Sequence, residues 1–345
     1  MKKNKSILVT GGAGFIGSNL VTLLVTKYPG TMIVNLDKLT YAGNLENLSQ
    51  VKDSQNYRFF EGDIGDRQLV EKIFHDYRID GVIHLAAESH VDNSIAGPRV
   101  FVETNVFGTF TLLDVARNCW MESPFKSKTG FEETRFHHVS TDEVYGTLGE
   151  TGYFTEETPY APNSPYSATK AGSDMLVRSY HHTYGINTVI TNCSNNYGPR
   201  QHSEKLIPVI IRKALAGEKI PIYGDGKNVR DWLYVEDHCQ ALDLVFHQGK
   251  AGEVYNIGGN CEMQNVDIAK IICTMLDQKS PRLDGKSYTD QISYVTDRPG
   301  HDRRYAIDAT KLKKELGWEP DARFENAIDV TVEWFLQKYS GKQSI

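Results

Sequence analysis

Two short stretches of the chain contain residue types that can exchange protons with a substrate. Residues 141–143, Thr-Asp-Glu, follow the apolar, strand-like run 136–140, so their polar side chains emerge where a strand ends. Tyr166 and Lys170 are four residues apart in a helical pattern, which places them on one face of the helix, one turn apart. A free tyrosine titrates near ~10, and a neighbouring ammonium favours its ionised form, so Tyr166 is expected to act as a base near neutral pH.

Neither stretch establishes a reaction by itself. The Tyr-x-x-x-Lys spacing is equally compatible with an exposed helical pair, and Thr141 could be a packing residue. Asp142 and Glu143 are more informative, because a strand end used only for packing has no need of two carboxylates facing a cleft. Thr141 lies 25 residues before Tyr166, a separation that lets the strand end and the next helix meet over one substrate. We therefore expect both stretches to form one site.

A glycine-rich turn near the start of the chain predicts a dinucleotide-binding unit. The β-rich run 7–10 is followed at once by GGAGFIG, residues 11–17, and then by helical spacing through residue 27. The glycines permit a tight turn and a close backbone approach, while the helix N-terminus presents free N–H groups to a pyrophosphate. Strand, glycine turn and helix in this order form the context that the motif requires.

An acidic residue at the end of the next strand indicates which dinucleotide binds. Asp37 follows the strand-like run 32–36 and lies 20 residues after Gly17, where a carboxylate is expected to bind the adenosine ribose. This favours NAD, because a 2′-phosphate would meet a like charge, although Lys38 keeps NADP open. The alternative is that Asp37 only caps a loop.

The elements around these residues predict the sheet that positions them. Further strand-like runs at 57–60, 82–87 and 187–192 alternate with helical patterns at 66–77, 99–121 and 165–184. Alternating units of this kind predict an α/β fold with a doubly wound parallel Rossmann sheet. Ligands bind beyond the carboxyl ends of such strands, and one cleft should collect the polar residues found there.

The last third of the chain predicts a smaller C-terminal α/β lobe over this cleft. After residue 200 short strands, prolines and scattered helices replace the regular alternation, with helices expected at 204–216, 264–277 and 309–316. We expect an NAD-binding domain at 1–194 with a return segment at 229–258, and a substrate-binding lobe at 195–228 and 259–340. The polar stretch 121–134 is expected to be a surface excursion.

Composition excludes several classes of protein. The chain has 345 residues, 40% of them hydrophobic and 24% charged, as in an ordinary globular protein. Its net charge of −6 argues against nucleic-acid and acidic-membrane partners. The five cysteines show no C-x-x-C and the histidines no zinc spacing, so we expect neither disulfides nor a metal. No apolar run reaches the ~18 residues of a membrane span, and a cytoplasmic enzyme is expected.

Taken together, the glycine turn, Asp37, residues 85–87 (Leu-Ala-Ala), Thr141 and the Tyr/Lys pair resemble the extended short-chain dehydrogenase/reductase superfamily over nearly the whole chain. Within it, residues 85–92, 140–146, 195–199 and 297–302 look like those of the dTDP-glucose 4,6-dehydratases. The resemblance implies tightly held NAD, a dTDP-glucose substrate, a homodimer, and a product, dTDP-4-keto-6-deoxy-glucose, that feeds deoxysugar (rhamnose) biosynthesis.

The resemblance also implies ligand contacts, one position at a time. The positions that it places against NAD are Gly11, Gly14, Phe15, Ile16, Gly17, Asp37, Lys38, Leu39, Thr40, Asp63, Ile64, Leu85, Ala86, Ala87, Ser89, Thr104, Tyr166, Lys170 and Asn196. The positions that it places on the sugar-nucleotide side are Ser89, Thr141, Asn195, Lys205, Leu206, Pro221, Ile222, Tyr223, Arg230, Asn265, Asp297, Arg298 and His301.

The roles of the catalytic groups follow from the same resemblance. Tyr166, assisted by Lys170, is expected to take the proton of the sugar C4 hydroxyl, which Thr141 helps to position. Glu143 would then remove the C5 proton while a protonated Asp142 donates to the departing C6 hydroxyl. Adjacent like charges push carboxyl pKa values apart, as this division requires. The residues alone establish only that a pair exists.

Two rival functions share parts of this pattern. A UDP-hexose 4-epimerase or another sugar-nucleotide dehydratase would need the same cofactor turn and Tyr/Lys pair, but an epimerase has no leaving hydroxyl for Asp142 to protonate. A non-enzymatic nucleotide-sensing protein would commonly lack Tyr166 or Lys170. No motif separates thymidine from uridine nucleotides. The helical patterns 99–121 and 165–184 are candidates for a dimer interface.

Overall fold

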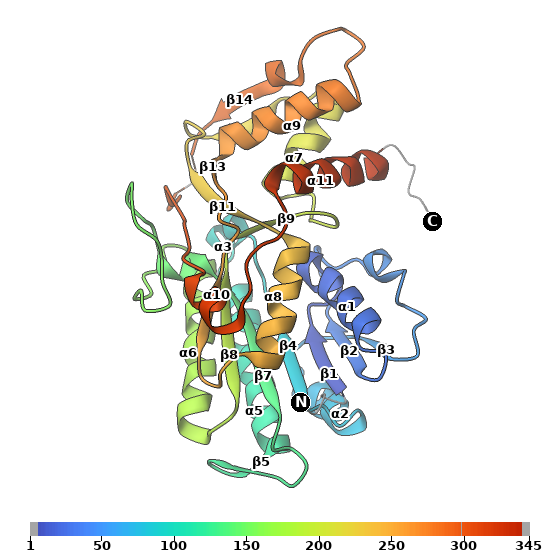
Figure 1. The fold of residues 1–345 in the computed structure, drawn as a ribbon, viewed down its shortest axis with the longest axis vertical. Helices are drawn as coiled ribbons and strands as arrows, with labels where there is room; N and C mark the ends of the chain where they lie inside the picture. Colours follow the sequence, from blue (N-terminus) through green and yellow to red (C-terminus); the bar gives the residue numbers. More distant parts are fainter. Residues whose placement is uncertain (1–5, 298, 340–345) are drawn as a thin grey trace.

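The chain is built around a seven-stranded parallel sheet in the order β12-β8-β7-β4-β1-β2-β3, seen in a computed structural model that describes residues 6–297 and 299–339 (Figure 1). The order reverses direction on either side of β1, which makes the sheet doubly wound. Its strands are β1 Ser6–Thr10, β2 Met32–Asp37, β3 Tyr57–Glu61, β4 Gly81–His84, β7 Arg135–Thr141, β8 Thr188–Cys193 and β12 Val254–Ile257. The predicted fold class is confirmed.

Successive side chains of β1 explain why helices cover both faces of this sheet. Ile7 and Val9 belong to one apolar core, with α1 (Phe15–Lys27) and α8 (Val235–Gln248). Leu8 belongs to the other, with helices of the opposite face. Because neighbouring side chains of a strand point to opposite faces, a strand that is apolar throughout must be covered on both sides. The helices of the second face are α2 Arg67–Asp76, α5 Thr109–Trp120 and α6 Pro165–Tyr184.

A smaller lobe lies beyond the carboxyl ends of the sheet strands, above the sheet in Figure 1. It contains a three-stranded sheet, β13-β11-β9, and a parallel pair, β10-β14. Its strands and main helices are β9 Asn195–Tyr197, α7 Leu206–Leu215, β10 Ile220–Tyr223, β11 Val229–Tyr234, β13 Glu262–Gln264, α9 Asn265–Lys279, β14 Ile292–Val295 and α11 Phe324–Tyr339, with α10 Thr310–Leu316 packed back against β12. Three separate stretches of the chain, 195–234, 262–295 and 324–339, form this lobe, so covering the sheet edge needs residues far apart in sequence.

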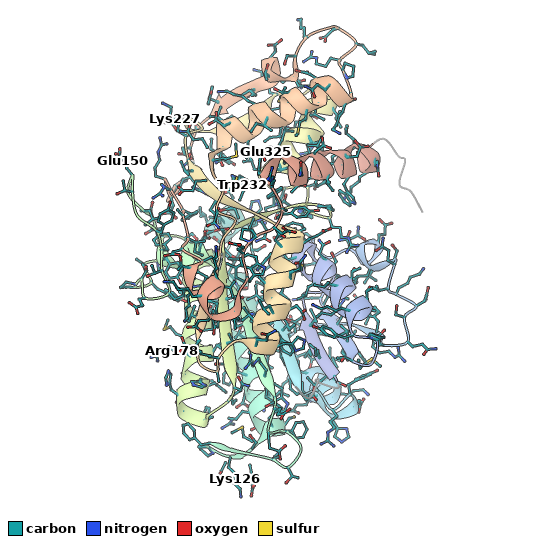
Figure 2. The ribbon with its side chains drawn as sticks, viewed as in Figure 1. Lys126, Glu150, Arg178, Lys227, Trp232 and Glu325 are labelled. Atoms are coloured by element: carbon teal, nitrogen blue, oxygen red, sulfur yellow. The ribbon has the colours of Figure 1, made fainter. Side chains whose placement is uncertain are left out.

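Short elements complete the fold. They are the 3₁₀ turns η1 Leu45–Leu48, η3 Asp142–Tyr145 and η4 Tyr288–Gln291, the helices α3 Val91–Ala96 and α4 Arg99–Phe101, the π-helix η2 Val102–Gly108, and the hairpin of β5 Met121–Ser123 and β6 Lys126–Ser127. The hairpin occupies the expected surface excursion, at the end of the molecule away from the smaller lobe, where Figure 2 labels Lys126.

The structure corrects several predicted elements. The strand expected at 82–87 ends at His84, and residues 85–87 continue as a loop in which the Ala86 N–H donates to Thr10 Oγ1 at 3.2 Å. The helix expected at 99–121 is interrupted by the π-helical turns of η2. Helices α8 and α11 had no counterpart among the predicted helices. Of the expected return segment, α8 and β12 join the large sheet, whereas β11 pairs within the smaller lobe. The proposed domain boundaries stay a prediction.

The described residues offer neither a metal-binding cluster nor a membrane-spanning helix. Residues 6–297 and 299–339 contain no cluster of three or more His, Cys, Asp or Glu side chains arranged to hold a metal ion. None of the helices in these residues combines the length and apolar character needed to cross a bilayer.

Candidate active site

A cavity of about 370 Å³ opens at the carboxyl ends of the central strands. Its walls come from the ends of β1, β2, β3, β4, β7 and β8, from the start of α6, and from β9, β11 and the start of α7 in the smaller lobe. Trp232 of β11 reaches it from the lobe, and Figure 2 shows this residue between the lobe and the large sheet. This is where a doubly wound sheet binds its ligand.

The glycine turn forms one end of the cavity. Gly11 has φ +72°, and a Cβ there would lie 2.7 Å from the Ala86 backbone nitrogen. A Cβ at Gly17 would lie 2.1 Å from the Gly11 carbonyl oxygen, so only glycine lets α1 begin this close to β1. Gly14 faces the cavity just before α1 starts at Phe15. Free N–H groups of the first helical turn there suit a pyrophosphate, and the turn therefore fits a dinucleotide.

Asp37 is fixed for ribose recognition at the end of β2. It is buried and lines the cavity, with Oδ2 accepting from the Ala13 N–H at 2.8 Å and Oδ1 from the Leu39 N–H at 2.9 Å. Carboxylate oxygens can each accept a second hydrogen bond, so a sugar hydroxyl can still bind. Lys38 pairs with Asp63 at 2.8 Å, which directs its charge away from a 2′-phosphate. Both features fit NAD.

The acidic pair lies where β7 turns into η3. Thr141 Oγ1 accepts from the Glu143 N–H at 3.3 Å and lies 3.4 Å from Asp142 Oδ1. Asp142 is 2% exposed, and its Oδ2 has no hydrogen-bond partner among the described residues. Burial first, then the charges of Glu143 and Asp231, raise the Asp142 pKa well above the ordinary value. These surroundings favour the protonated form of Asp142, which can donate, while Glu143 lines the cavity as a partly exposed neighbour.

Tyr166 and Lys170 face the same cavity from the first turns of α6. The helix starts sharply because Ser164 and Ser167 form a reciprocal capping box around Pro165. Burial and the charge of Glu143 raise the pKa of Tyr166, whereas a hydrogen bond with Thr141 lowers it. This differs from the expectation that Lys170 would lower this pKa, since the Lys170 Nζ instead donates to the Val139 carbonyl at 2.8 Å.

The cavity brings together most of the residues expected at the site. All five catalytic candidates line it, as do Ser89, Thr104, Asn195, Asn196, Lys205, Leu206 and the remaining cofactor candidates apart from Leu39. Leu39 instead has φ +52° and packs into the core beside β2, contributing its backbone N–H to Asp37. Residues of the smaller lobe, among them Lys205, Leu206 and Trp232, also line the cavity, and the glycine motif does not predict them.

The other residues expected on the sugar-nucleotide side form a second group in the lobe, outside the cavity walls. Pro221, Ile222 and Tyr223 lie in β10, and the Tyr223 ring is 6.1 Å from that of His301. His301 Nδ1 lies 2.5 Å from Asp297 Oδ1. Asn265 begins α9, donating its N–H to the Asn228 carbonyl at 3.0 Å. Arg298 lies outside the described residues.

Arg230 connects this second group with the acidic pair. It is 5% exposed, its guanidinium lies 4.3 Å from the centre of the Tyr305 ring, and its Nη2 donates to the Asp302 carbonyl at 2.9 Å. Its charge lowers the pKa of Asp142, against the larger effect of burial. Arg230 is thus a buried cation close to the site rather than a solvated surface residue.

Several residues of the cavity were not expected from the sequence. Cys193 is the last residue of β8, and Ser194 comes directly after it. They could have been predicted from the sequence, because residues 140–143 were selected by the same criterion, their position at the end of a strand. His202 and Glu204 lie in the connection before α7. Trp232 reaches the cavity through the pairing of β11 with β9, for which the sequence carries no local signal.

Comparison with known proteins agrees with this geometry. Residues 8–331 match the family model described as GDP-mannose 4,6 dehydratase. A dTDP-glucose 4,6-dehydratase from Xanthomonas campestris pv. campestris is 58% identical over 338 residues, which cover 98% of this chain and 95% of the relative. The crystal structure of a dTDP-glucose 4,6-dehydratase from Bacillus anthracis, in complex with NAD, has a TM-score of 0.85 at 46% identity and covers 97% of each chain.

The epimerases are similar in fold but more distant in sequence. The crystal structure of UDP-glucose 4-epimerase from Thermotoga maritima with UDP-glucose has a TM-score of 0.83 at 30% identity, covering 97% of this chain and 99% of that one. The fold is therefore shared with epimerases, whereas the higher sequence identity lies with the dehydratases. The chain therefore belongs to the dTDP-glucose 4,6-dehydratase family of the extended short-chain dehydrogenase/reductases.

Proposed function

We propose that this chain converts dTDP-glucose into dTDP-4-keto-6-deoxy-glucose, with NAD as a cofactor that is regenerated in each turnover. The observation that carries this proposal is the buried Asp142, with its raised pKa, beside Glu143, both lining one cavity with Tyr166. An epimerase needs no acid for a leaving hydroxyl, so a second carboxyl held neutral at this position favours dehydration. NAD, when bound, supplies the oxidation at C4 and the later reduction at C6.

Tyr166 is the base for the first step. It accepts the proton of the C4 hydroxyl, which Thr141 orients through its own hydroxyl. Without bound ligands the pKa of Tyr166 is raised, which disfavours the phenolate that the reaction needs. A nearby cation favours the phenolate and therefore opposes this effect. Lys170, on the same face of α6, supplies one such charge.

Asp142 and Glu143 divide the elimination between them. A ketone at C4 acidifies the C5 proton, and Glu143 removes that proton as general base. Asp142 donates its proton to the C6 hydroxyl, which leaves as water. The pKa of Asp142, raised mainly by burial, supports its role as the acid, and the greater exposure of Glu143 supports its role as the base.

Proton balance gives Thr141 a second task. Glu143 returns its proton to C5 when C6 is reduced, so Glu143 is restored. Tyr166, however, ends each turnover with one proton more, and Asp142 with one proton less. The Thr141 hydroxyl bonds to Tyr166 and lies 3.4 Å from Asp142 Oδ1, which supports a path for this proton back to Asp142.

The homodimer is part of the same proposal. Large apolar side chains that are exposed in the single chain gather near η2, α5 and α6, namely Val102, Phe107, Phe110 and Met175. Helices α5 and α6 lie side by side, and an exposed apolar face of this kind is typical of a helical interface. A cytoplasmic location and a place in deoxysugar (rhamnose) biosynthesis stay predictions from the sequence.

A product assay tests the function directly. The purified chain is incubated in parallel with dTDP-glucose and with UDP-glucose, and each mixture is examined for water loss and for the alkali-absorbing 4-keto sugar. We expect the keto product from dTDP-glucose, at a higher rate than from UDP-glucose. Formation of dTDP-galactose instead would favour the epimerase, and a preference for UDP-glucose would overturn the substrate assignment.

A further inference from the structure

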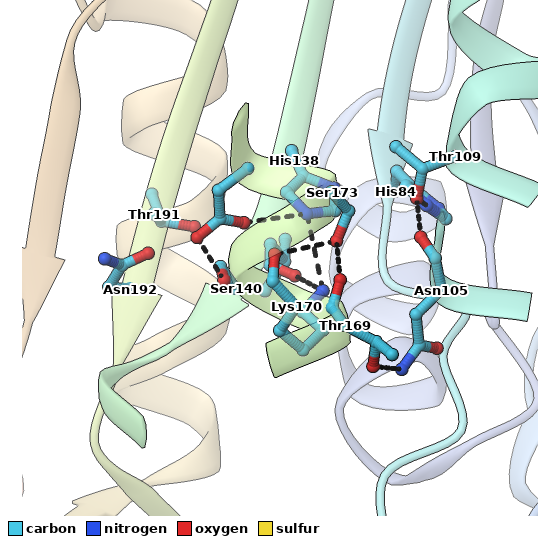
Figure 3. Close-up of polar contacts among 12 residues, drawn as sticks. His84, Asn105, Thr109, His138, Ser140, Thr169, Lys170, Ser173, Thr191 and Asn192 are labelled. Carbon is cyan, nitrogen blue, oxygen red and sulfur yellow. Dashed lines mark hydrogen bonds and ion pairs between the residues drawn. The ribbon is translucent and has the colours of Figure 1, made fainter. Parts of the chain in front are cut away.

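Behind the cavity wall, Lys170 belongs to a buried cluster of polar side chains. Its Nζ lies 3.4 Å from His138 Nε2, and this nitrogen lies 3.1 Å from Asp174 Oδ1 (Figure 3). Ser140 Oγ donates to Asp174 Oδ2 at 2.8 Å. Lys170, His138 and Asp174 are 4%, 0% and 1% exposed, so all three are shielded from water.

Asp174 is the carboxylate that compensates the Lys170 charge. Burial lowers the pKa of Lys170, and the charge of Asp174 is the largest influence that raises it. Burial raises the pKa of Asp174 to about 6, while Lys170, Ser140 and Tyr160 act in the opposite direction. An ammonium ion buried without a counter-charge loses its proton readily, so the charge of Lys170 depends on that of Asp174.

His138 lies between the two charged groups, with one ring nitrogen close to both. Burial and the charge of Lys170 lower the His138 pKa well below the ordinary value, so the ring is neutral. Its Nδ1 has no hydrogen-bond partner among the described residues, and Nε2 is the nitrogen near both neighbours. Nε2 can accept a hydrogen bond from the Lys170 ammonium, whereas Asp174 Oδ1 has no hydrogen-bond partner among the described residues and acts on this group through its charge. The neutral ring thus lies between the two charged groups.

The other titratable groups near this pair keep one charge state around neutral pH. They are His84 of β4, Tyr145 of η3, Tyr160 before α6 and Cys193 of β8. Burial lowers the pKa of His84 and raises those of Tyr145, Tyr160 and Cys193, so all four are neutral. Within the described part of this cluster, Asp174 and Lys170 are therefore the groups whose charge changes.

We propose that Asp174, through its negative charge in the buried cluster behind the cavity wall, is a positioning residue that keeps Lys170 an ammonium ion one helical turn from the catalytic tyrosine. This inference rests on the proposed function and extends it to residues that do not line the cavity. The backbone carbonyl of Val139 fixes where the Lys170 Nζ points, and Asp174 fixes its charge. The reaction consequently depends on a carboxylate that never touches the substrate.

The Asp174→Asn variant tests this inference through the pH dependence of kcat with dTDP-glucose. Without the negative charge the pKa of Lys170 falls, so we expect the alkaline limb of the kcat profile to move to lower pH by about one unit or more. The KM for dTDP-glucose should change less than kcat, because the substrate does not contact Asp174. A profile that keeps its shape and only falls uniformly would overturn the inference, since loss of packing alone has that effect.

Ser173→Ala is the matched control. Ser173 is a fully buried hydroxyl on the same helix that donates to the Thr169 and Lys170 carbonyls, at 3.1 and 2.8 Å, and not to Asp174. Its removal should leave both limbs of the profile in place. An equal shift in Ser173→Ala would show that any buried polar loss moves the profile, and would also overturn the inference.

If Asp174→Asn does not fold, the Ser140→Ala variant tests the role of Asp174 instead. Losing the donor to Asp174 Oδ2 raises the Asp174 pKa, so the acidic limb should move to higher pH, and an unmoved limb would contradict the proposal. A wild-type chain that fails to convert dTDP-glucose would count against the proposed function alone. The same variants would then be compared through the pH dependence of NAD affinity, because Lys170 lines the cofactor cavity.

Discussion

Asp142 and Glu143 are neighbours in sequence, yet the fold gives their carboxyl groups different surroundings. Asp142 turns into the protein and is 2% exposed, whereas Glu143 is partly exposed at the cavity wall. A carboxyl that is desolvated beside another negative charge stays protonated, and a better solvated one ionises. Two residues of almost the same chemistry therefore acquire opposite proton-transfer roles from their positions in one 3₁₀ turn.

Replacing Asp142 with Asn should stabilise the chain while damaging its reaction. The raised pKa means that the unfolded chain loses this proton first as the pH rises, so wild-type stability falls between the ordinary value and the folded value. Asn does not ionise, and its Tm should exceed that of the wild type at neutral pH by an amount worth on the order of 1.4 kcal/mol per pKa unit. The turnover number should fall about 10²- to 10⁴-fold.

Thermal melts from acid to neutral pH check the sign of this effect. The Tm difference between Asp142→Asn and wild type should shrink toward zero as the pH falls below about 4, where the unfolded chain also becomes protonated at this position. Asp53→Asn, at an exposed aspartate, serves as the control and should show no such trend. A stability difference that does not vary with pH would contradict the assignment of a protonated Asp142.

Thr141→Val and Thr141→Ser separate the two tasks given to this hydroxyl. Val keeps the shape and removes the proton path between Tyr166 and Asp142, so the first turnover should be faster than the following ones. Ser keeps the hydroxyl, and its turnovers should all proceed at one rate. Rapid mixing with dTDP-glucose measures this as a burst of product close to the enzyme concentration. Equal slowing of all turnovers in the Val variant would leave Thr141 with an orienting role only.

At the level of helices and strands, the sequence predicted those elements whose position depends on a local residue pattern. The strand, glycine turn and helix at 7–27 were correctly placed because apolar runs and glycines act within a few residues. The π-helical turns of η2 and the end of β4 at His84 were not, since both depend on packing. Trp232 joins the cavity only through long-range pairing of β11 with β9, which no local pattern encodes.

Gly17→Ala tests whether the glycine turn is required as a geometric unit. Its Cβ would lie 2.1 Å from the Gly11 carbonyl oxygen, so the turn must open and the N–H groups at the start of α1 must move. We expect NAD affinity to fall at least about 10-fold, equivalent to ~1.4 kcal/mol. NAD titration, together with the NAD content of the purified protein, measures this effect.

Gly30→Ala is the control for this substitution. A Cβ at Gly30 would meet nothing within 4 Å in the described part of the chain. This variant should bind NAD like the wild type. Wild-type affinity in Gly17→Ala would show that the close approach of α1 to β1 is not needed for cofactor binding.

At the scale of the whole molecule, the lobe and the sheet edge together enclose the reaction. Lys205, Leu206 and Trp232 close the cavity from the lobe side, while the sheet supplies the acids, the tyrosine and the glycine turn. Exclusion of water strengthens the interactions among charges inside such a site. The large sheet alone would leave the carboxyl ends of its strands open to solvent.

Phe107→Glu tests the proposed dimer at the same scale. Phe107 is 56% exposed on η2, and a carboxylate within an apolar interface should weaken dimerisation by at least about 10-fold. Phe125→Glu is the matched control, because Phe125 is 72% exposed between the strands of the β5–β6 hairpin. Sedimentation should show a dimer for the wild type and for Phe125→Glu, and a monomer for Phe107→Glu. A monomeric wild type would contradict the proposal.

The central claim is that Glu143 removes the C5 proton while Asp142 supplies the proton for the leaving hydroxyl. The most direct measurement mixes the NAD-loaded Glu143→Gln variant with dTDP-glucose in D₂O and follows NADH absorbance, C5 deuteration and release of the 4-keto product. Glu150→Gln, in an exposed loop, is the control and should behave as the wild type. We predict that Glu143→Gln accumulates NADH, with neither C5 deuteration nor keto product. Deuteration at C5 and full turnover at the wild-type rate would contradict the account.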